Sequence, residues 1–107
     1  MIEVKKHSQR GNNHTFTLHV TRPGNNFTPQ SSDENQLKQS LTTSTNVSDQ
    51  ATTTCSKVQM KLLDPPDDQI LEIIVIISPN DGQTVEQLKP FIIHRIGQWA
   101  TKVGTIS

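Results

Sequence analysis

The sequence predicts an α+β fold in the order β-β-short α-β-β-α, in which two β-hairpins form a mainly antiparallel sheet covered by a C-terminal helix. Two parts of the chain alternate apolar and polar residues with a period of two, as half-buried strands do. A third part, near the C-terminus, repeats its apolar residues every three or four positions, as an amphipathic helix does. A polar segment rich in Ser and Thr separates the two hairpins.

The first hairpin is predicted from the alternation in residues 2–5 and 15–21. Ile2 and Val4 alternate with charged residues, and the second stretch alternates apolar residues with Thr and His. Between them, residues 10–13 read Arg-Gly-Asn-Asn. Because Gly and Asn accept positive φ angles at little cost, these residues predict a turn that joins two antiparallel strands.

The middle of the chain, residues 28–57, is predicted to be a mobile polar segment within one small domain. Of its 30 residues, 13 are Ser or Thr. One part of it resembles a helix, because Ser31 and Glu34 have the spacing of a capping box and two leucines follow four residues apart. We expect a short helix over residues 32–41 and mobility in residues 42–53.

The second hairpin is predicted from residues 58–62 and 70–77. The first stretch alternates apolar and polar residues, and the consecutive prolines in residues 64–68 turn the chain. Residues 70–77 are apolar except for Glu72, which is typical of a central strand covered on both faces. One such small domain supplies little cover for two faces, so we expect a homodimer or a larger assembly to supply the rest.

The C-terminal helix is predicted over residues 85–103 from its apolar spacing. Pro90 predicts either a kink or a short first turn followed by a helix that begins at Pro90. The apolar arc is wide, because Phe91, Ile93 and Trp99 broaden it. Since aromatic residues often anchor interfaces, we predict a partner interface at these three residues, with simple core packing as the alternative.

Composition excludes several classes of protein. The chain has 107 residues, of which 31% are hydrophobic, and its 10 basic residues balance its 10 acidic residues. It has no apolar run close to the ~20 residues of a membrane span and no apolar core of a signal peptide near its N-terminus. Its single cysteine cannot form an internal disulfide. We therefore expect a cytoplasmic protein without membrane contact.

No group of residues in the sequence has the pattern of a catalytic, metal or cofactor site, and we expect none of these functions. Cys55 is predicted to be a small core residue, and the aspartates of residues 64–68 are turn residues. The glycines do not form a phosphate-binding loop. The histidines lack the ligand spacing of zinc sites, and those of the first hairpin are expected to face solvent. The four are His7, His14, His19 and His94.

These observations favour a small non-enzymatic interaction or assembly protein, such as an accessory subunit or an adaptor, that binds a protein partner or itself. The alternative is a nucleic-acid-binding regulatory protein that uses its basic first hairpin. The chain as a whole is neutral and the hairpin has no Tyr or Trp to stack on bases, so this alternative comes second. Its candidate contact residues are Lys5, Lys6, Arg10 and Arg22.

Overall fold

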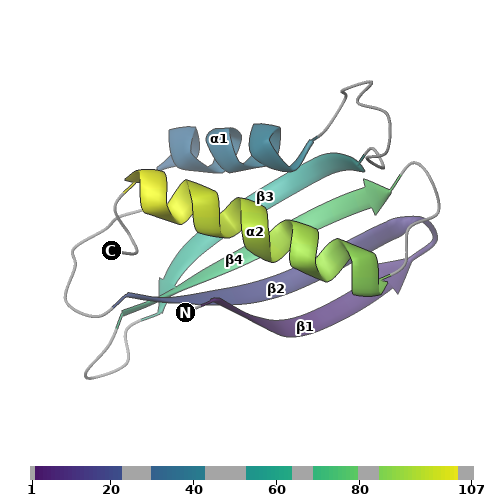
Figure 1. Ribbon diagram of the computed structural model, residues 1–107, viewed down its shortest axis with the longest axis horizontal. Coiled ribbons are helices and arrows are strands. Elements are labelled where there is room, and N and C mark those ends of the chain that lie inside the picture. The colour runs from purple at the N-terminus through teal and green to yellow at the C-terminus, as the bar shows by residue number, and fades with distance from the viewer. Residues whose placement is uncertain (1, 23–29, 43–52, 64–68, 80–84, 104–107) are drawn as a thin grey trace.

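The computed structural model describes residues 2–22, 30–42, 53–63, 69–79 and 85–103 of the chain (Figure 1). The described residues form an α+β fold, which confirms the predicted class and the predicted order of elements. In chain order the elements are β1 (Ile2–Arg10), β2 (Asn13–Arg22), α1 (Ser31–Leu41), β3 (Thr53–Leu63), β4 (Gln69–Pro79) and α2 (Val85–Val103).

The four strands form one antiparallel sheet in the order β1-β2-β4-β3. Both predicted hairpins are present, because β1 pairs with β2 and β3 pairs with β4. At the tip of the first hairpin Gly11 has a φ of 60°, a conformation that glycine adopts without strain. β4, which contains the apolar residues 70–77, lies between β2 and β3 as the prediction of a central strand requires.

Both helices lie on the same face of the sheet (Figure 1). α1 packs along β3, and α2 lies beside α1 and reaches β1. Along β4, Ile73 and Val75 are fully buried, whereas Ile74 and Ile76 between and beside them are partly exposed. No helix among the described residues covers the second face of β4, so they supply only one of the two covers that the sequence predicts.

One hydrophobic core fills the space between the helices and the sheet. It contains the apolar residues that the periodicity places on the inner faces of the elements, and Cys55 is among them as predicted. The buried members are Phe16, Leu18, Val20, Leu37, Leu41, Cys55, Val58, Leu71, Ile73, Val75, Ile77, Leu88, Ile92, Ile96, Trp99 and Ala100.

The start of α1 differs by one residue from the predicted capping box. The backbone N–H of Gln30 donates to the Asp33 carboxylate at 2.9 Å, so Asp33 closes the first turn in place of Glu34. Glu34 instead accepts a hydrogen bond of 2.9 Å from the backbone N–H of Met60. Because β3 is an edge strand, this contact satisfies a backbone group that no neighbouring strand pairs with.

Two threonines join the end of α1 to the start of β3. The Thr53 hydroxyl donates to the Leu41 carbonyl at 2.8 Å, and the Thr42 hydroxyl accepts from the Cys55 backbone N–H at 3.0 Å. β3 therefore begins before the residue at which the sequence predicts it. Of the residues predicted to be mobile, 42–53, all but the first and the last lie outside the described residues.

α2 runs from Val85 to Val103 with Pro90 inside it. The predicted alternative in which the helix begins at Pro90 is therefore wrong. Pro90 lacks an N–H, which removes the helical hydrogen bond to the carbonyl of Glu86 four residues earlier. Both residues are exposed, so water can satisfy that carbonyl and the helix tolerates the proline.

Candidate functional site

The face of the sheet opposite the helices, called here the open face, is the main candidate for a functional surface. It consists of the strand residues that alternate with the core residues. They are Glu3, Lys6, Ser8 and Arg10 of β1, Thr15, Thr17, His19 and Thr21 of β2, Ile70, Glu72, Ile74 and Ile76 of β4, and Lys57, Gln59, Lys61 and Leu63 of β3.

An apolar stripe runs along the centre of the open face. It consists of Ile70, Ile74 and Ile76, which are partly exposed. β4 is the only strand that contributes three apolar residues to this face within the described chain. The ladder neighbours of Ile74 and Ile76 on both sides are polar: Thr15, Thr17, Lys57 and Gln59. The stripe is therefore one strand wide at Ile74 and Ile76, whereas at Ile70 it continues onto Leu63 of β3, which is also partly exposed.

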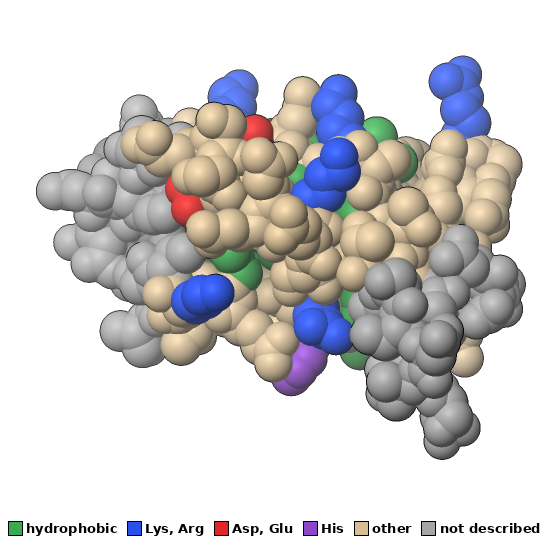
Figure 2. All heavy atoms as spheres, turned by 90° about the horizontal axis from the view of Figure 1, so that it is seen from above, with side chains coloured by type: hydrophobic (Ala, Val, Ile, Leu, Met, Phe, Trp, Pro, Cys, Tyr) green, Lys and Arg blue, Asp and Glu red, His purple; other side chains and the backbone are tan. Residues whose placement is uncertain are grey.

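Basic side chains flank this stripe from the two outer strands. Lys6 and Arg10 lie on β1, Lys57 and Lys61 lie on β3, and all four are exposed. Three strand spacings of about 4.8 Å separate the two rows, which places them about 14 Å apart. In the view of Figure 2, basic side chains project along the upper border of the molecule and also lie over its middle and lower part, whereas the acidic side chains in view lie toward the left.

The acidic residues of the open face each have a partner. Glu72 Oε2 lies 3.1 Å from His19 Nε2, and Glu3 Oε2 lies 2.9 Å from Lys5 Nζ. The hydrogen bond and the charge of Lys5 hold the pKa of Glu3 below its ordinary value. The described residues of the open face include four basic side chains and two acidic ones, so this set of residues is net basic.

A hollow of about 390 Å³ lies at the β3 side of the open face. Its lining combines two apolar side chains with charges of both signs, a mixture that is common at protein interfaces. The lining residues are Gln59, Lys61, Glu72 and Ile74, together with Glu34 and Met60 at the edge of β3.

The structure separates the three residues that the sequence predicts as a partner interface. Trp99 is 4% exposed and belongs to the core, where it lines a cavity of about 130 Å³ between α1 and α2. Phe91 and Ile93 are only partly buried against the core. The Arg95 guanidinium lies over the Phe91 ring, 5.5 Å from its centroid. Of the three, Phe91 and Ile93 have surface that a partner can reach.

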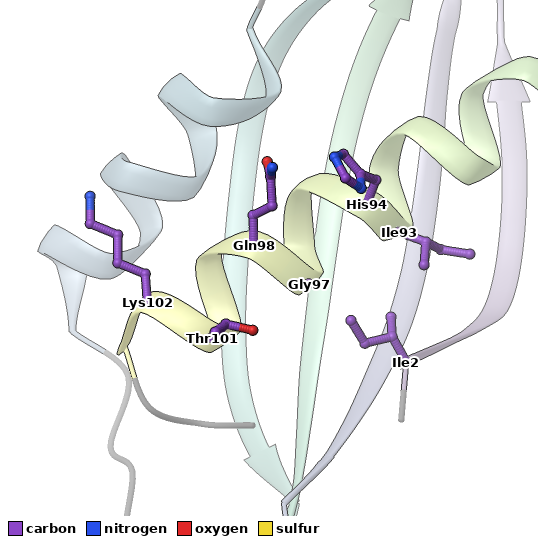
Figure 3. Close-up of a pocket in the computed structure, with 7 residues that line it drawn as sticks. All are labelled: Ile2, Ile93, His94, Gly97, Gln98, Thr101 and Lys102. Atoms are coloured by element: carbon purple, nitrogen blue, oxygen red, sulfur yellow. The ribbon is translucent and has the colours of Figure 1, made fainter. Parts of the chain in front are cut away.

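Ile93 borders a groove of about 800 Å³ between α2 and the start of β1 (Figure 3). In Figure 3, Ile93 and Thr101 lie on the side of α2 that faces Ile2. The helix passes close to β1 at Gly97, because a Cβ atom there would lie 3.7 Å from Ile2 Cδ1. The described lining includes no carboxylate and no cysteine: Ile2, Ile93, His94, Gly97, Gln98, Thr101 and Lys102.

The basic residues predicted on the first hairpin do not all lie together. Lys6 and Arg10 share the open face, whereas Lys5 lies at a bulge in β1 and pairs with Glu3. The side chain of Arg22 lies outside the described part of the structure.

Sequence reasoning missed Lys57 and Lys61 as partners of the hairpin cations. Their alternation with Val58 and Met60 assigns them to the polar face of their own hairpin. The alternation does not show that β1 and β3 are the two outer strands of one sheet, which is a property of the strand order. The shared basic surface therefore becomes visible only in the fold.

Two histidines form a pair on the helix-facing side of the first hairpin. His7 Nε2 lies 3.0 Å from His14 Nδ1, and the Phe16 ring centroid lies 4.7 Å from that of His7. His14 is 4% exposed, so the expectation that the hairpin histidines face solvent is wrong for His14. Burial lowers the pKa of His14, and the charge of His7 lowers it further. The hydrogen bond requires one of the two ring nitrogens to accept, so at least one ring is neutral.

We expect the protein to lose stability as the pH falls below 6.5, the ordinary pKa of histidine. The folded pKa of His14 lies below that value, so the unfolded chain binds more protons between the two pKa values. The stabilisation is complete above 6.5 and is lost as the pH falls through the folded pKa. Urea unfolding of wild type and His14→Gln at about pH 7.5 and about pH 5.5 measures this loss.

His94→Gln is the matched control, because His94 is exposed on α2. The control variant should keep the pH dependence, and His14→Gln should reduce it. An equal pH dependence in wild type and His14→Gln would contradict the role of His14.

Cys55 lies in the core and is 3% exposed. Burial raises the pKa of its thiol, which keeps the sulfur protonated and unreactive. Among the described residues, no three His, Cys, Asp or Glu side chains are grouped so that they could hold a metal ion. None of the described helices is long and apolar enough to pass through a membrane.

Comparisons of the chain with protein-family models, with curated proteins and with solved structures give no match.

Proposed function

We propose that the chain is a small non-enzymatic interaction protein, an adaptor or accessory subunit, that binds a protein partner through the open face of its sheet. The main support is the one-sided cover of β4, which leaves Ile70, Ile74 and Ile76 partly exposed. Burying such surface contributes about 25 cal/mol per Å² to association. An apolar centre with a polar and charged rim is also the usual composition of a protein interface.

The charges of the open face favour a different protein over a second copy of this chain. Two open faces in contact would bring the basic rows of both copies close together, and like charges across an interface oppose association. Self-association, which the sequence leaves open, would then need another surface. The groove beside Ile93 is the described surface that suits it, because its two isoleucines lie outside the basic rows.

Site-specific cross-linking tests this proposal. A photoreactive amino acid in place of Thr17 lies on the open face, and the same amino acid in place of Lys38 is the control on exposed α1. In cells that produce the chain naturally, we expect protein adducts from position 17 that position 38 does not form. The cross-linked protein is then purified and titrated against wild type and Ile74→Asp.

Loss of binding in Ile74→Asp, with wild-type binding intact, supports the proposal. The same adducts from both positions, or a partner that binds Ile74→Asp as tightly as wild type, contradict it. In either of those cases the open face is not the binding surface.

A nucleic-acid-binding function is the second candidate, favoured by the basic rows on the open face. Against it, the centre of the face is aliphatic and contains Glu72, whereas bases stack on aromatic side chains. Binding of a mixed-sequence DNA or RNA duplex should then weaken at least tenfold between about 50 and about 200 mM salt. Four alanine substitutions should abolish it: Lys6→Ala, Arg10→Ala, Lys57→Ala and Lys61→Ala.

A further inference from the structure

We propose that the occupant of the open face is an amphipathic helix of the partner, with an apolar stripe and acidic residues along both sides of that stripe. This inference rests on the proposed protein-binding function and specifies the class of partner. Three features of the open face support it: the pairing of its inner strands, the width of its apolar stripe, and the placement of its basic rows.

The pairing of the inner strands favours a helix over an extended segment. β2 is paired with β1 and β4, and β4 is paired with β2 and β3. Their backbone groups are therefore occupied, and a strand laid on this face would leave its own N–H and C=O groups without partners. A helix satisfies its backbone internally and can contact a sheet face through side chains alone.

The width of the apolar stripe favours one helix over a second sheet. A sheet that packs face to face needs inward apolar residues on several strands. Here Ile74 and Ile76 have Thr, Lys and Gln as ladder neighbours, and within the described strands the one apolar neighbour of the stripe is Leu63 beside Ile70. From Ile70 to Ile76 the stripe is about 20 Å long, which corresponds to about 13 residues of helix.

The basic rows define the charge of the occupant. They lie about 14 Å apart, and a helix with its side chains is about 10–12 Å wide. A helix on the stripe therefore has Lys6 and Arg10 along one side and Lys57 and Lys61 along the other. Asp or Glu on both flanks of the helix would pair with these rows.

The anion within the stripe does not conflict with this arrangement. Glu72 separates Ile70 from Ile74, but it hydrogen-bonds His19 and is the register partner of Lys61. Its carboxylate therefore already has a hydrogen-bond partner on the same face before any partner binds.

Two synthetic peptides test the proposal with the full chain. Both are helical and about 18 residues long with the same leucine stripe; one has Glu on both flanks and the other has Lys. We expect the Glu peptide to bind, and we expect its affinity to fall at least tenfold between about 50 and about 500 mM salt. The Lys peptide should bind at least tenfold more weakly at low salt.

Charge variants of the chain complete the test. The affinity for the Glu peptide should fall at least tenfold in the double variant Lys57→Glu with Lys61→Glu. It should fall less in the neutral double variant, Lys57→Gln with Lys61→Gln. The matched control is Lys89→Glu with Lys102→Glu, an equal charge change on exposed positions of α2. This control should bind like wild type, because α2 lies on the other face of the sheet.

Several results would overturn the inference. One is equal affinity of the chain for the Glu and Lys peptides. Another is a loss of affinity in the control variant as large as in Lys57→Glu with Lys61→Glu. A third is that the Glu peptide shifts NMR signals of the groove beside α2 and not those of β2 and β4. A mixed-sequence DNA duplex that binds while the Glu peptide does not would favour the nucleic-acid alternative. A cross-linked partner that needs Ile74 but contacts it without an acidic helix overturns only this inference and leaves the proposed function intact.

Discussion

Ile73→Asp is expected to unfold the protein, whereas Ile74→Asp is expected to leave it folded. Ile73 is fully buried under the helices, and Ile74 lies on the open face. Truncating a buried isoleucine costs about 2–5 kcal/mol, and a buried unpaired carboxylate costs several more. The whole free energy of unfolding of a small domain is only about 5–15 kcal/mol. On the open face, the same substitution costs about 1 kcal/mol, mainly through lower strand propensity.

Circular dichroism and urea unfolding of the two variants measure this contrast. The variants carry the same chemical change at adjacent positions of one strand, so any difference reports which face each position occupies. Similar destabilisation by both would mean that a further layer covers the second face of β4. Ile74→Asp also serves the cross-linking experiment, because it removes the stripe from a chain that is expected to remain folded.

Trp99→Ala is expected to lower the free energy of unfolding by about 3–5 kcal/mol, as loss of a large buried aromatic does. Trp99 is 4% exposed and packs with the core at the contact between α1 and α2. Its removal opens a cavity next to one that already exists there, so the packing between the two helices loosens.

Urea unfolding followed by circular dichroism measures the effect without relying on the tryptophan signal. Phe91→Ala is the comparison, and it should cost less because Phe91 is only partly buried. A loss below about 1 kcal/mol for Trp99→Ala would show that the side chain is not a core residue. The interface role predicted for Trp99 would then regain support.

Much of the fold is predictable because strand and helix periodicity are local properties of the backbone. The alternation of residues 15–21 identifies the inward face of β2, where Phe16 and Leu18 are fully buried. The apolar spacing in residues 85–103 likewise identifies the buried face of α2. The capping box predicted at Ser31 and Glu34 is wrong by one residue, because the carboxylates of Asp33 and Glu34 can both accept a hydrogen bond at the start of α1. Glu34 accepts a hydrogen bond from the backbone N–H of Met60 instead, and Met60 is distant in the sequence.

The candidate site is less predictable, because it joins residues that are far apart in the chain. The amino-acid sequence is sufficient to assign the strands, the helices and the polarity of each of their faces. It also identifies the hairpin cations Lys6 and Arg10 and the apolar run that includes Ile74.

The strand order and the placement of both helices on one face depend on contacts between distant segments, which no local pattern specifies. These contacts leave Ile74 and Ile76 partly exposed, bring Lys57 and Lys61 to the same face as Lys6, and bury Trp99. The open face exists because two helices are available to cover one side of a sheet whose central strand is apolar on both sides.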